Sequence, residues 1–269
     1  AISVMNESPG KASALLFART LRAAFLGRKS DSEILLPTVG QTDLYVSGAI
    51  RYLTGRKATL LHNAEAVSME VRNSAVSHVL LKNGTRLSAD VVIGAVPYWS
   101  WHRILPGKIG HEHPFAGLSR IESSPIISLH LWFERDFMNA DFLGLIGRRI
   151  QWVFNRRRIM NEQWKESGYL SAVISGAHRF IALSRHTLLS MALEDLREVY
   201  PEMGKLLSSV VIKEKRATFS PTCDVGRWRP SPQTPMRNLF LAGDWTDTGL
   251  PATIEGAVLS GFPAARLVR

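Results

Sequence analysis

The sequence predicts an α/β fold in two parts, a parallel-sheet domain with a β-meander and a second region of sheet and helix inserted into it. Residues 91–96 and 239–242 are apolar without alternation, as in strands buried on both faces of a parallel sheet. Residues 67–87 hold short strands separated by turns, and residues 98–216 hold longer alternating strands and a helix. The 269 residues, 45% of them apolar, suffice for a sizeable core.

Two helices are expected before the first strand. Ser8 followed by Pro9 is typical of a helix start, and Gly27 of a helix end. The apolar residues between them recur at helical spacing: Ala14, Phe17, Leu21 and Phe25. A second helix is expected from Thr42 to about Leu53, with an inward face formed by Leu44, Ile50 and Leu53.

Strand patterns follow from residue 57 onward. Short strands are expected over 58–61, 67–71, 76–81 and 85–87. Asn83-Gly84 is a strong hairpin signal before the last of these, so the segment is interpreted as a meander. The buried strand from Val91 to Val96 comes next, and Pro97 ends it.

The region from 98 to 216 is expected to fold as a sheet with a helix. Alternation from 123 to 133 predicts one strand, and 150–154 and 169–175 predict two more. Apolar residues at helical spacing predict a helix through Leu189, Ala192, Leu196 and Val199. The large aromatic residues of this region are expected in its core: Trp132, Trp152 and Trp164.

The charge is basic and unevenly distributed. The chain has 33 Lys plus Arg and 23 Asp plus Glu, a formal net charge of +10. Residues 1–60 carry 8 basic and 4 acidic side chains, and residues 145–216 carry 13 and 7. No nucleic-acid-binding motif accompanies this excess, so no nucleic acid partner is expected. The arginines at 156–158 suit either phosphates or a solvated turn.

The remaining composition points weakly to the cytoplasm. The single cysteine, Cys223, cannot form an intramolecular disulfide. The sequence has no run of the ~20 apolar residues that a membrane span needs, and its start lacks the order of a secretory signal. Because the sequence opens with Ala1 rather than Met, a processed chain or a piece of a longer protein is expected.

The segment from 238 to 257 carries the clearest chemical signal. A buried strand stops at Gly243-Asp244, a loop follows, and a helix is expected with Pro251 in its first turn. Unpaired N–H groups at a helix start attract negative charge, and ligands of open α/β sheets lie beyond the carboxyl ends of the strands. The ligand site is therefore predicted at this loop.

Small residues occupy one face of that helix. Ala252, Gly256 and Ser260 follow one another at four-residue spacing, so a backbone or a flat ring can approach closely. The same spacing is equally compatible with tight helix packing alone. Pro263 should kink or end the helix, because it removes the hydrogen bond to the Leu259 carbonyl.

These residues resemble a known family. The run LFLAGDWTDTGLPATIEGAVLSG resembles the C-terminal FAD motif of the flavin amine oxidase and carotenoid desaturase superfamily. Within it, the chain is similar to the squalene-associated FAD-dependent desaturases, the hydroxysqualene dehydroxylases of hopanoid biosynthesis. The similarity extends over the chain through VMNESPGKASALLFARTLRAAFLG, LLPTVGQTDLY, VVIGAVP, SPIISLHLWF, QWVFNR, YLSAVISGA, KRATFSPT and the pair RP at 229–230.

The resemblance implies an FAD-binding, Rossmann-like domain and an α+β substrate domain. Residues 56–97 and 217–269 would form the FAD domain, residues 98–216 the substrate domain, and residues 1–55 a helical part of the substrate domain that leads into the FAD domain. No metal is implied. The implied FAD ligands are Gly243 and Asp244 for the ribityl and phosphate portion, the N–H groups of Ala252, Thr253 and Ile254 for the isoalloxazine, Ala66 for the adenine, and Ala95 to Pro97 on the other side.

The sequence departs from the superfamily pattern at its start. The superfamily opens with a strand, a G-x-G-x-x-G turn and a helix that cradles the pyrophosphate, and this sequence contains none of them. The chain is therefore expected to be a C-terminal piece that lacks this βαβ unit and needs it for FAD.

The implied reaction is reductive dehydroxylation of hydroxysqualene to squalene by hydride transfer from flavin N5. An apolar channel built by residues 98–216 and the first helices would hold the isoprenoid. The catalytic proton donor is not identified; His130, His178 and Asp247 are candidates by chemical type alone, and a structural role is expected for each.

Other readings stay open. A carotenoid or diapocarotenoid desaturase is the nearest alternative, an amine oxidase is further off, and a truncated, non-catalytic chain that cannot retain FAD is the alternative of another class. A basic nucleic-acid-binding protein is the remotest. The basic surface is expected to rest on anionic lipid, as a peripheral protein of the cytoplasmic membrane.

Overall fold

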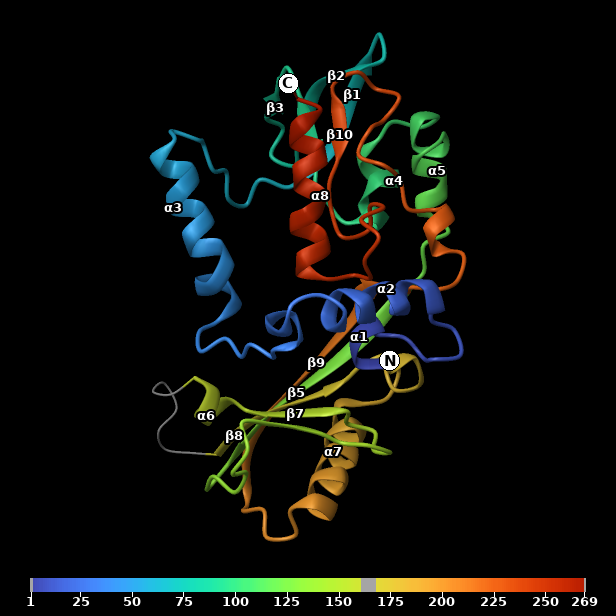
Figure 1. Cartoon of the computed structure of the whole chain (residues 1–269). Helices are drawn as coiled ribbons and strands as arrows, with labels where there is room; N and C mark the ends of the chain where they lie inside the picture. Colours follow the sequence, from blue (N-terminus) through green and yellow to red (C-terminus); the bar gives the residue numbers. More distant parts are fainter. Residues whose placement is uncertain (1, 161–167, 269) are drawn as a thin grey trace.

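The computed structural model describes residues 2–160 and 168–268, which form an upper and a lower part in the view of Figure 1. The upper part contains an antiparallel meander, a parallel strand pair and α8 (Ile254–Arg266). The lower part contains a five-stranded sheet and α7 (Arg185–Val199). Helices α1 (Ile2–Met5) and α2 (Ala14–Phe25) lie between them.

Two small sheets build the upper part. The meander consists of β1 (Ala66–Arg72), β2 (Ala75–Leu81) and β3 (Arg86–Leu87), which confirms the strands predicted at 67–71, 76–81 and 85–87. β4 (Val92–Gly94) pairs in parallel with β10 (Leu239–Leu241), as their apolar runs predict. Apolar side chains between these sheets and the neighbouring helices form the upper core, which includes Leu16, Met69, Trp101, Phe115, Ile121, Leu239, Leu241 and Trp245.

Short helices complete the upper part around these sheets. They are η3 (Tyr98–Ser100), α4 (Trp101–Ile104), η4 (Ile109–His111), α5 (Phe115–Leu118) and η6 (Val225–Arg227). Their apolar side chains pack in the upper core, although the sequence assignment grouped residues 98–122 with the substrate region.

The lower part is an antiparallel sheet with one covered face. Its strand order is β6-β7-β8-β5-β9, and every neighbouring pair is antiparallel. The strands are β5 (Ser123–Phe133), β6 (Phe142–Gly144), β7 (Trp152–Asn155), β8 (Gly168–Ile174) and β9 (Leu206–Phe219), with α6 (Arg156–Ile159) and η5 (Ala177–Arg179) in the connections. Helix α7 packs on one face to form the lower core, which includes Ile127, Leu129, Leu131, Leu170, Leu188 and Leu196.

Most of this sheet was predictable, but one long strand was not. The strands expected at 123–133, 150–154 and 169–175 and the helix expected through 189–199 are confirmed. β9 was missed, because residues 213–216 read Lys-Glu-Lys-Arg and interrupt the apolar alternation that identifies a strand.

The other face of the sheet carries side chains that α7 does not cover. Alternation along β5 buries Leu129 and Leu131 on the α7 side and leaves His130 and Trp132 half-buried on the opposite side. Trp152 is likewise half-buried, so the prediction of core positions for these two tryptophans is wrong. Trp164 lies outside the described residues.

The segment before the meander is more exposed than predicted. α2 begins after Ser13, whose Oγ accepts a hydrogen bond from the Leu16 N–H at 3.3 Å, and not at Ser8, because the chain turns between them. The helix expected from 42 to 53 is a π-helix (Thr42–Val46) followed by α3 (Ser47–Gly55), and η1 (Lys29–Ser32) precedes it.

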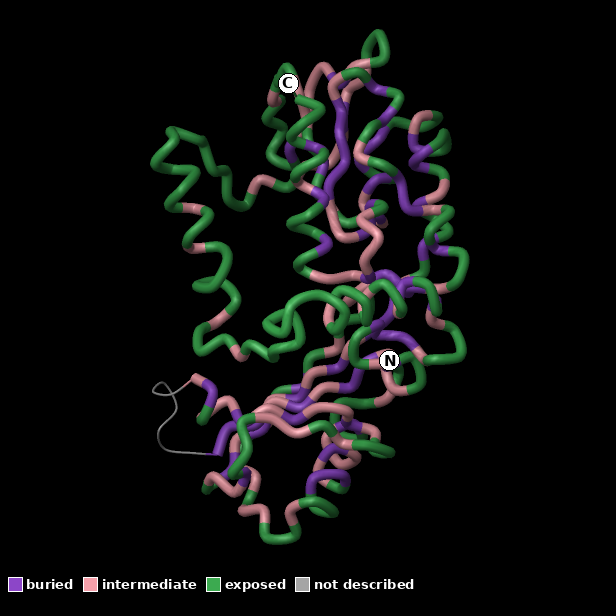
Figure 2. Tube along the Cα trace, viewed as in Figure 1, coloured by how far each residue is buried: buried purple, intermediate pink, exposed green. Residues whose placement is uncertain are grey.

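The inward face expected for that helix is wrong. Leu44 and Leu53 are exposed, because α3 stands apart from both cores, as Figures 1 and 2 show. The strand expected at 58–61 is also wrong, since those residues form an irregular connection to the meander.

The parallel pair and α8 differ from the predictions in three ways. Ile93 is 44% exposed, so β4 is not buried on both faces. α8 begins at Ile254 behind the N-cap Thr253, so Pro251 precedes the helix. The helix also continues past Pro263 to Arg266, because a missing N–H so close to the end removes little of the helical hydrogen bonding.

A buried polar network joins the N-terminal segment to the top of the lower sheet. Asn6 Nδ2 donates to the Ser124 carbonyl and to Thr218 Oγ1, at 3.2 and 2.8 Å, and Asn6 Oδ1 accepts from the Gly176 N–H at 2.7 Å. The Ser124 hydroxyl in turn donates to the Asn6 carbonyl. One asparagine side chain thereby connects β5, β9 and the turn after β8.

Glu7 extends this network. It is 1% exposed and accepts hydrogen bonds from Ser220 Oγ at 2.6 Å and from the Ser8 N–H at 2.8 Å, and it lies 3.0 Å from His178 Nε2. Burial would raise the pKa of Glu7, but these hydrogen bonds outweigh it and hold the pKa below the ordinary value. The carboxylate is therefore a structural anion of the junction.

Two features of the described residues bear on function. No helix among residues 2–160 and 168–268 is long and apolar enough to cross a membrane. In the same ranges no group of three or more His, Cys, Asp or Glu side chains is placed to hold a metal ion.

Asp195 offers a test of the lower core. Its buried carboxylate accepts hydrogen bonds from the N–H groups of Arg149 and Ile150 and from the Arg149 guanidinium, at 2.7 to 3.0 Å. We expect Asp195→Ala to lower the free energy of unfolding by about 3–5 kcal/mol, because it leaves a guanidinium and two backbone donors without their acceptor. Urea unfolding measures this loss.

Glu194 provides the matched control. Its carboxylate lies 3.0 Å from the same guanidinium but is mostly exposed, so Glu194→Ala should cost less than about 1 kcal/mol. Equal losses for the two variants would contradict the assignment of Asp195 as the anchor.

Candidate functional site

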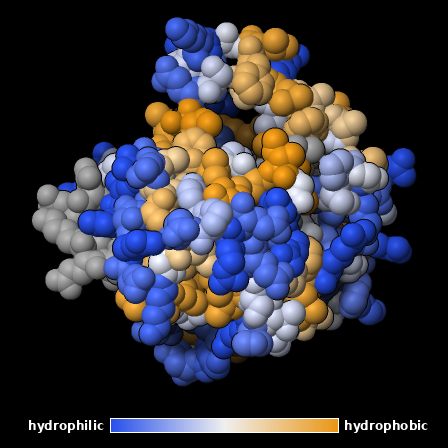
Figure 3. Space-filling model, turned by 90° about the horizontal axis from the view of Figure 1, so that it is seen from below, coloured by the Kyte–Doolittle hydropathy of each residue, from blue (hydrophilic) through white to orange (hydrophobic). Residues whose placement is uncertain are grey.

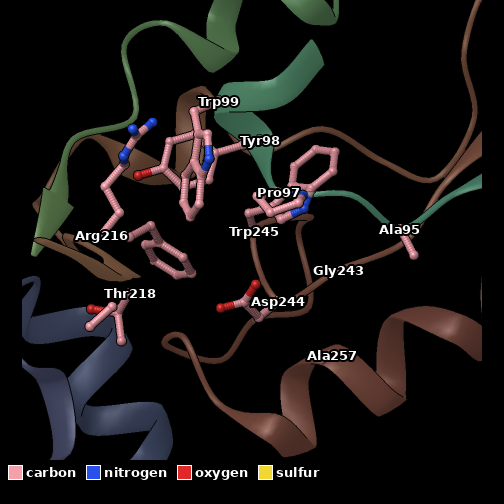
Figure 4. Close-up of a pocket in the computed structure, with 12 residues that line it drawn as sticks. Ala95, Pro97, Tyr98, Trp99, Arg216, Thr218, Gly243, Asp244, Trp245 and Ala257 are labelled. Carbon is pink, nitrogen blue, oxygen red and sulfur yellow. The ribbon is translucent and has the colours of Figure 1, made fainter. Parts of the chain in front are cut away.

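A cavity lies where the carboxyl ends of β4 and β10 meet the end of β9 and the side of α8 (Figure 4). Because β4 and β10 are parallel, the chain leaves both strands at the same edge. The cavity has a volume of about 200 Å³, and its lining consists of Ala95, Pro97, Tyr98, Trp99, Arg216, Ala217, Thr218, Phe219, Gly243, Asp244, Trp245 and Ala257. We call this space the loop cavity.

Gly243 sets the course of the chain out of β10. Its φ is +138°, and a Cβ at this position would lie 2.4 Å from Trp245 Nε1. The Gly243 N–H donates to Ser260 Oγ on α8 at 2.7 Å, and Trp245 Nε1 donates to the Val96 carbonyl at 3.1 Å. A residue with a side chain is therefore excluded here both by conformation and by space.

Asp244 follows directly and points its carboxyl group into the loop cavity (Figure 4). Burial raises the pKa of this carboxyl above its ordinary value, and the backbone N–H groups of Trp245 and Asp244 and the charge of Arg229 offset part of that effect. The group can accept hydrogen bonds from ligand hydroxyls in a site that is largely shielded from water.

An aromatic and cationic wall faces Asp244. The Tyr98 hydroxyl lies 2.5 Å from Ser123 Oγ, and burial raises the pKa of Tyr98, so the phenol keeps its proton. The Arg216 guanidinium lies 4.9 Å from the centre of a Trp99 ring. The cavity thus offers one half-buried carboxyl, the hydroxyls of Tyr98 and Thr218 and one cation beside apolar side chains.

The start of α8 lies beside the cavity. Thr253 Oγ1 accepts a hydrogen bond from the Gly256 N–H at 2.9 Å, which satisfies one of the free donors at the helix start. The small face of the helix packs on the neighbouring loop, because a Cβ on Gly256 would come within 3.5 Å of Thr253, Thr248 and the Pro251 carbonyl. Of the two readings of the small residues, the structure therefore favours tight packing at this position.

The predicted site residues divide into two groups in space. Ala95, Pro97, Gly243 and Asp244 line the loop cavity together. The other four do not line it: Ala252, Thr253 and Ile254 lie at the start of α8, and Ala66 begins β1 opposite Leu81. The roles of all eight toward a cofactor stay predictions.

Eight lining residues were not among the predicted site residues. They are Tyr98, Trp99, Trp245, Ala257, Arg216, Ala217, Thr218 and Phe219. The last four come from the end of β9, where the KRATFSPT run was the available signal. Without a predicted strand there, nothing in the sequence placed this run beside Asp244.

The three acid–base candidates lie outside the loop cavity. His130 Nδ1 is 2.8 Å from the Tyr169 hydroxyl on the open face of the sheet, and burial, with a smaller effect of Arg156, lowers the pKa of His130. His178 belongs to the Glu7 network, 3.2 Å from Ser124 Oγ. The Asp247 N–H donates to the Pro230 carbonyl at 2.9 Å. None of the three is among the residues that line the loop cavity.

A second, apolar cavity lies on the open face of the lower sheet. It has a volume of about 440 Å³, and its lining consists of Ser3, Ile34, Leu36, Ile126, Phe142, Trp152, Phe154, Val173 and Ser175. Three of its rings form a group with centroid separations of 5.8 to 6.2 Å: Phe142, Trp152 and Phe154. We call this space the apolar groove; the segment after η1 supplies its cover.

The two cavities adjoin one ladder. In the pairing of β5 with β9, Ile126 of the groove lies opposite Glu214, two residues before Arg216 of the loop cavity. Ser124 lies opposite Thr218, which also lines the loop cavity. Neighbouring residue pairs of one ladder therefore border the groove and the loop cavity.

Comparisons with curated proteins place these features in context. Hydroxysqualene dehydroxylase from Sinorhizobium fredii is 29% identical over 273 residues, which cover 99% of this chain and 60% of that protein. The 15-cis-phytoene desaturase of Narcissus pseudonarcissus is 25% identical over 257 residues, which cover 92% of this chain and 43% of that protein. The chain thus spans about 60% of the length of the dehydroxylases that it matches.

Solved structures agree on the fold. An oxidoreductase from Methanosarcina mazei superposes with a TM-score of 0.66 at 16% sequence identity, over 82% of this chain and 53% of that one. The α/β fold expected from the sequence is therefore confirmed.

The family itself follows from the sequence match. A family model described as flavin containing amine oxidoreductase matches residues 29–269, which include both strands of the parallel pair, the loop with Asp244 and all of α8. With this match over most of its length, the chain belongs to the flavin-containing amine oxidoreductase family.

Proposed function

We propose that the chain is the larger portion of an FAD-dependent oxidoreductase that converts hydroxysqualene to squalene. The observation that carries this proposal is the apolar groove, which borders the same β5–β9 ladder as the loop cavity with its half-buried Asp244 carboxyl. The relatives named hydroxysqualene dehydroxylase support this substrate, and the phytoene desaturases support the broader class of isoprenoid substrates.

The residues of the loop cavity fit a flavin nucleotide. Asp244 offers a half-buried acceptor for the ribityl hydroxyls, and Gly243 lets the backbone approach closely. Ala95 and Ala257 leave room beside them, and the N–H groups of residues 252–254 would face the isoalloxazine edge. When bound and reduced, FAD would supply the hydride that replaces the hydroxyl group of the substrate.

Residues of the chain would supply the remaining requirements of the reaction, which are orientation of the substrate, exclusion of water and hydrogen bonding. The groove would orient the isoprenoid and exclude water, so that the allylic carbon meets the loop cavity. The substrate hydroxyl would take up a proton supplied from solvent and leave as water while the carbon accepts the hydride. Tyr98 keeps its proton and can donate a hydrogen bond within the cavity. Residues of the β5–β9 ladder line both the loop cavity and the apolar groove, so the same two strands would hold cofactor and substrate.

We further propose that full FAD affinity requires a glycine-rich βαβ segment in addition to these residues. The relatives are longer than this chain, and the parallel pair leaves Ile93 exposed. Apolar side chains on the outer face of α8 are exposed as well: Ile254, Val258, Leu259 and Phe262. Such a segment would cover apolar surface and supply donors for the pyrophosphate.

The third proposal concerns a lipid surface. Apolar and basic side chains are exposed together on α2, η1 and the chain after it, a surface that we call the α2–η1 surface. It consists of Leu21, Arg22, Phe25, Leu26, Arg28, Lys29, Ile34 and Leu35. Ile34 also lines the apolar groove, so a lipid drawn from the membrane would enter there. In the view from below, apolar atoms border a hollow in the upper half of the face (Figure 3).

The basic residues of the chain differ in whether they form ion pairs. Two of the arginines at 156–158 are paired, Arg157 with Asp136 at 3.7 Å and Arg158 with Asp141 at 2.9 Å. Arg28 and Lys29 make no ion pair among the described residues. We therefore propose peripheral contact with the cytoplasmic membrane through the α2–η1 surface.

The main experiment tests cofactor and reaction together. The chain is purified with and without an N-terminal glycine-rich segment taken from a dehydroxylase relative, and its visible flavin absorbance is recorded. We expect stoichiometric FAD in the extended protein and reduced retention in the chain alone. The extended protein, given a reductant and hydroxysqualene, should form squalene in a lipid analysis.

Other outcomes would decide against this function. Desaturation of phytoene without dehydroxylation would make the protein a carotenoid desaturase. An extended protein that binds no FAD would support the non-catalytic reading of the chain.

A second prediction concerns the apolar groove. Val173→Asp should weaken the binding of a squalene-type lipid by at least about tenfold, because it places a charge among apolar side chains. Ile146→Asp is the matched control, since Ile146 is 98% exposed in the turn after β6. Equal lipid affinities for the two variants, both shown to be folded by circular dichroism, would place the substrate elsewhere.

A third prediction concerns the membrane. The double variant Arg28→Glu/Lys29→Glu should float less with anionic liposomes than the unchanged protein, since each basic residue near a lipid surface contributes about 1 kcal/mol. The matched control, Arg227→Glu/Arg266→Glu, makes the same charge change on exposed positions of the upper part. Flotation that does not depend on lipid charge would contradict the proposed contact.

A further inference from the structure

Arg229 is a buried cation behind the loop that carries Asp244. It is 5% exposed, and its guanidinium lies 4.7 Å from the centre of the Phe219 ring. Phe219 lines the loop cavity, so Arg229 lies one layer behind the cavity wall. The Arg229-Pro230 pair belongs to the sequence similarity with the desaturase family, but the sequence assigned no role to this arginine.

One nitrogen of Arg229 contacts three groups of the loop. Its Nη2 donates to the Asp244 carbonyl at 2.9 Å, to the Thr246 carbonyl at 2.5 Å and to Thr248 Oγ1 at 3.0 Å. The next residue, Pro230, accepts from the Asp247 N–H at 2.9 Å. Residues 229 and 230 therefore hold the loop from 244 to 248 at four points.

The positive charge of Arg229 lies among neutral hydrogen-bond acceptors. Among the residues that the structure describes, no carboxylate forms an ion pair with Arg229, and its buried Nε has no hydrogen-bond partner. Burial lowers the pKa of Arg229, and the more distant carboxylates of Asp247 and Asp244 oppose that effect. Burying a cation on neutral acceptors is unfavourable. Packing alone therefore does not account for a buried arginine at position 229.

The orientation of the Asp244–Trp245 peptide indicates what the function of Arg229 is. In the trans peptide between Asp244 and Trp245, the carbonyl and the N–H point in opposite directions. The carbonyl accepts a hydrogen bond from Arg229 Nη2 at 2.9 Å, and the Trp245 N–H is near enough to the Asp244 carboxyl to offset part of the effect by which burial raises its pKa. A rotation of this peptide would break both contacts, so Arg229 and the carboxyl hold the peptide from its two sides.

We propose that Arg229 is a positioning residue, which fixes the Asp244–Trp245 peptide and thereby aims the Asp244 carboxyl at a flavin nucleotide in the loop cavity. This inference rests on the proposed function. Arg229 acts through Asp244, and so its contribution to FAD affinity disappears when the carboxylate is removed.

A double-mutant cycle tests this dependence. FAD dissociation constants are measured by flavin fluorescence for Arg229→Gln, Asp244→Asn and the double variant, in the version of the protein that retains FAD. We expect each single change to weaken FAD binding about 10- to 100-fold, as for the loss of a hydrogen bond to a charged group. The double variant should bind FAD about as weakly as Asp244→Asn alone.

Arg149→Gln is the matched control for the same chemical change. Arg149 holds Asp195 in the lower core, away from the loop cavity. Its loss should lower stability against urea and leave FAD affinity within about twofold of the unchanged protein. This control separates general destabilisation from loss of positioning.

Arg229→Lys keeps the experiment interpretable if Arg229→Gln does not fold. Lysine retains the charge and can reach one or two of the acceptors, but it lacks the planar fork of arginine. We expect a smaller loss of FAD affinity, which again vanishes in the Asp244→Asn background.

The outcomes are distinguishable. Additive losses in the double variant, or unchanged FAD affinity in both Arg229 variants, would overturn the positioning role and leave the proposed function standing. An unchanged protein that binds no FAD even with the glycine-rich segment would overturn the proposed function itself.

Discussion

The antiparallel ladder between β5 and β9 is the constraint on which the rest of the structure depends. It runs from the pair Phe133–Leu206 at the bottom of the lower sheet to the pair Ser123–Phe219 at the loop cavity. The lower half of the ladder belongs to the lower core, and its top forms one wall of the cavity. The apolar groove and the loop cavity are therefore held in a constant relation by backbone hydrogen bonds and not by a flexible linker.

The top of this ladder contains more buried polar groups than its lower part, and this difference has a physical cause. Where two sheets and two chain crossings meet, backbone donors cannot all be paired within regular structure. Asn6 Oδ1 accepts from the Gly176 N–H and Glu7 accepts from the Ser8 N–H, while Asn6 Nδ2 donates to the Ser124 carbonyl. The short N-terminal segment is thus a structural part of the junction, although it contributes little apolar core.

Close packing explains the small residues around the loop cavity. A Cβ on Gly94 would lie 2.2 Å from the ring of Trp101, and one on Gly243 would meet Trp245 at 2.4 Å. The two tryptophans pack against each other at 6.3 Å between ring centroids. Both strand ends must therefore carry glycine where they face this aromatic pair. The polar groups beside these glycines are positioned by rigid neighbours.

The sequence by itself determined the strands with clear alternation, the positions of the two parallel strands and the loop with Gly243 and Asp244, because hydrophobic period and turn residues are local properties. It did not determine β9, whose charged run hides its alternation, or the exposure of Leu44 and Leu53, which depends on what packs against them. Only the tertiary structure brought Arg216 and Phe219 beside Asp244 and placed Arg229 behind it. Those contacts join residues from different strands and loops, and a side chain's role in such a site depends on neighbours that the local sequence does not specify.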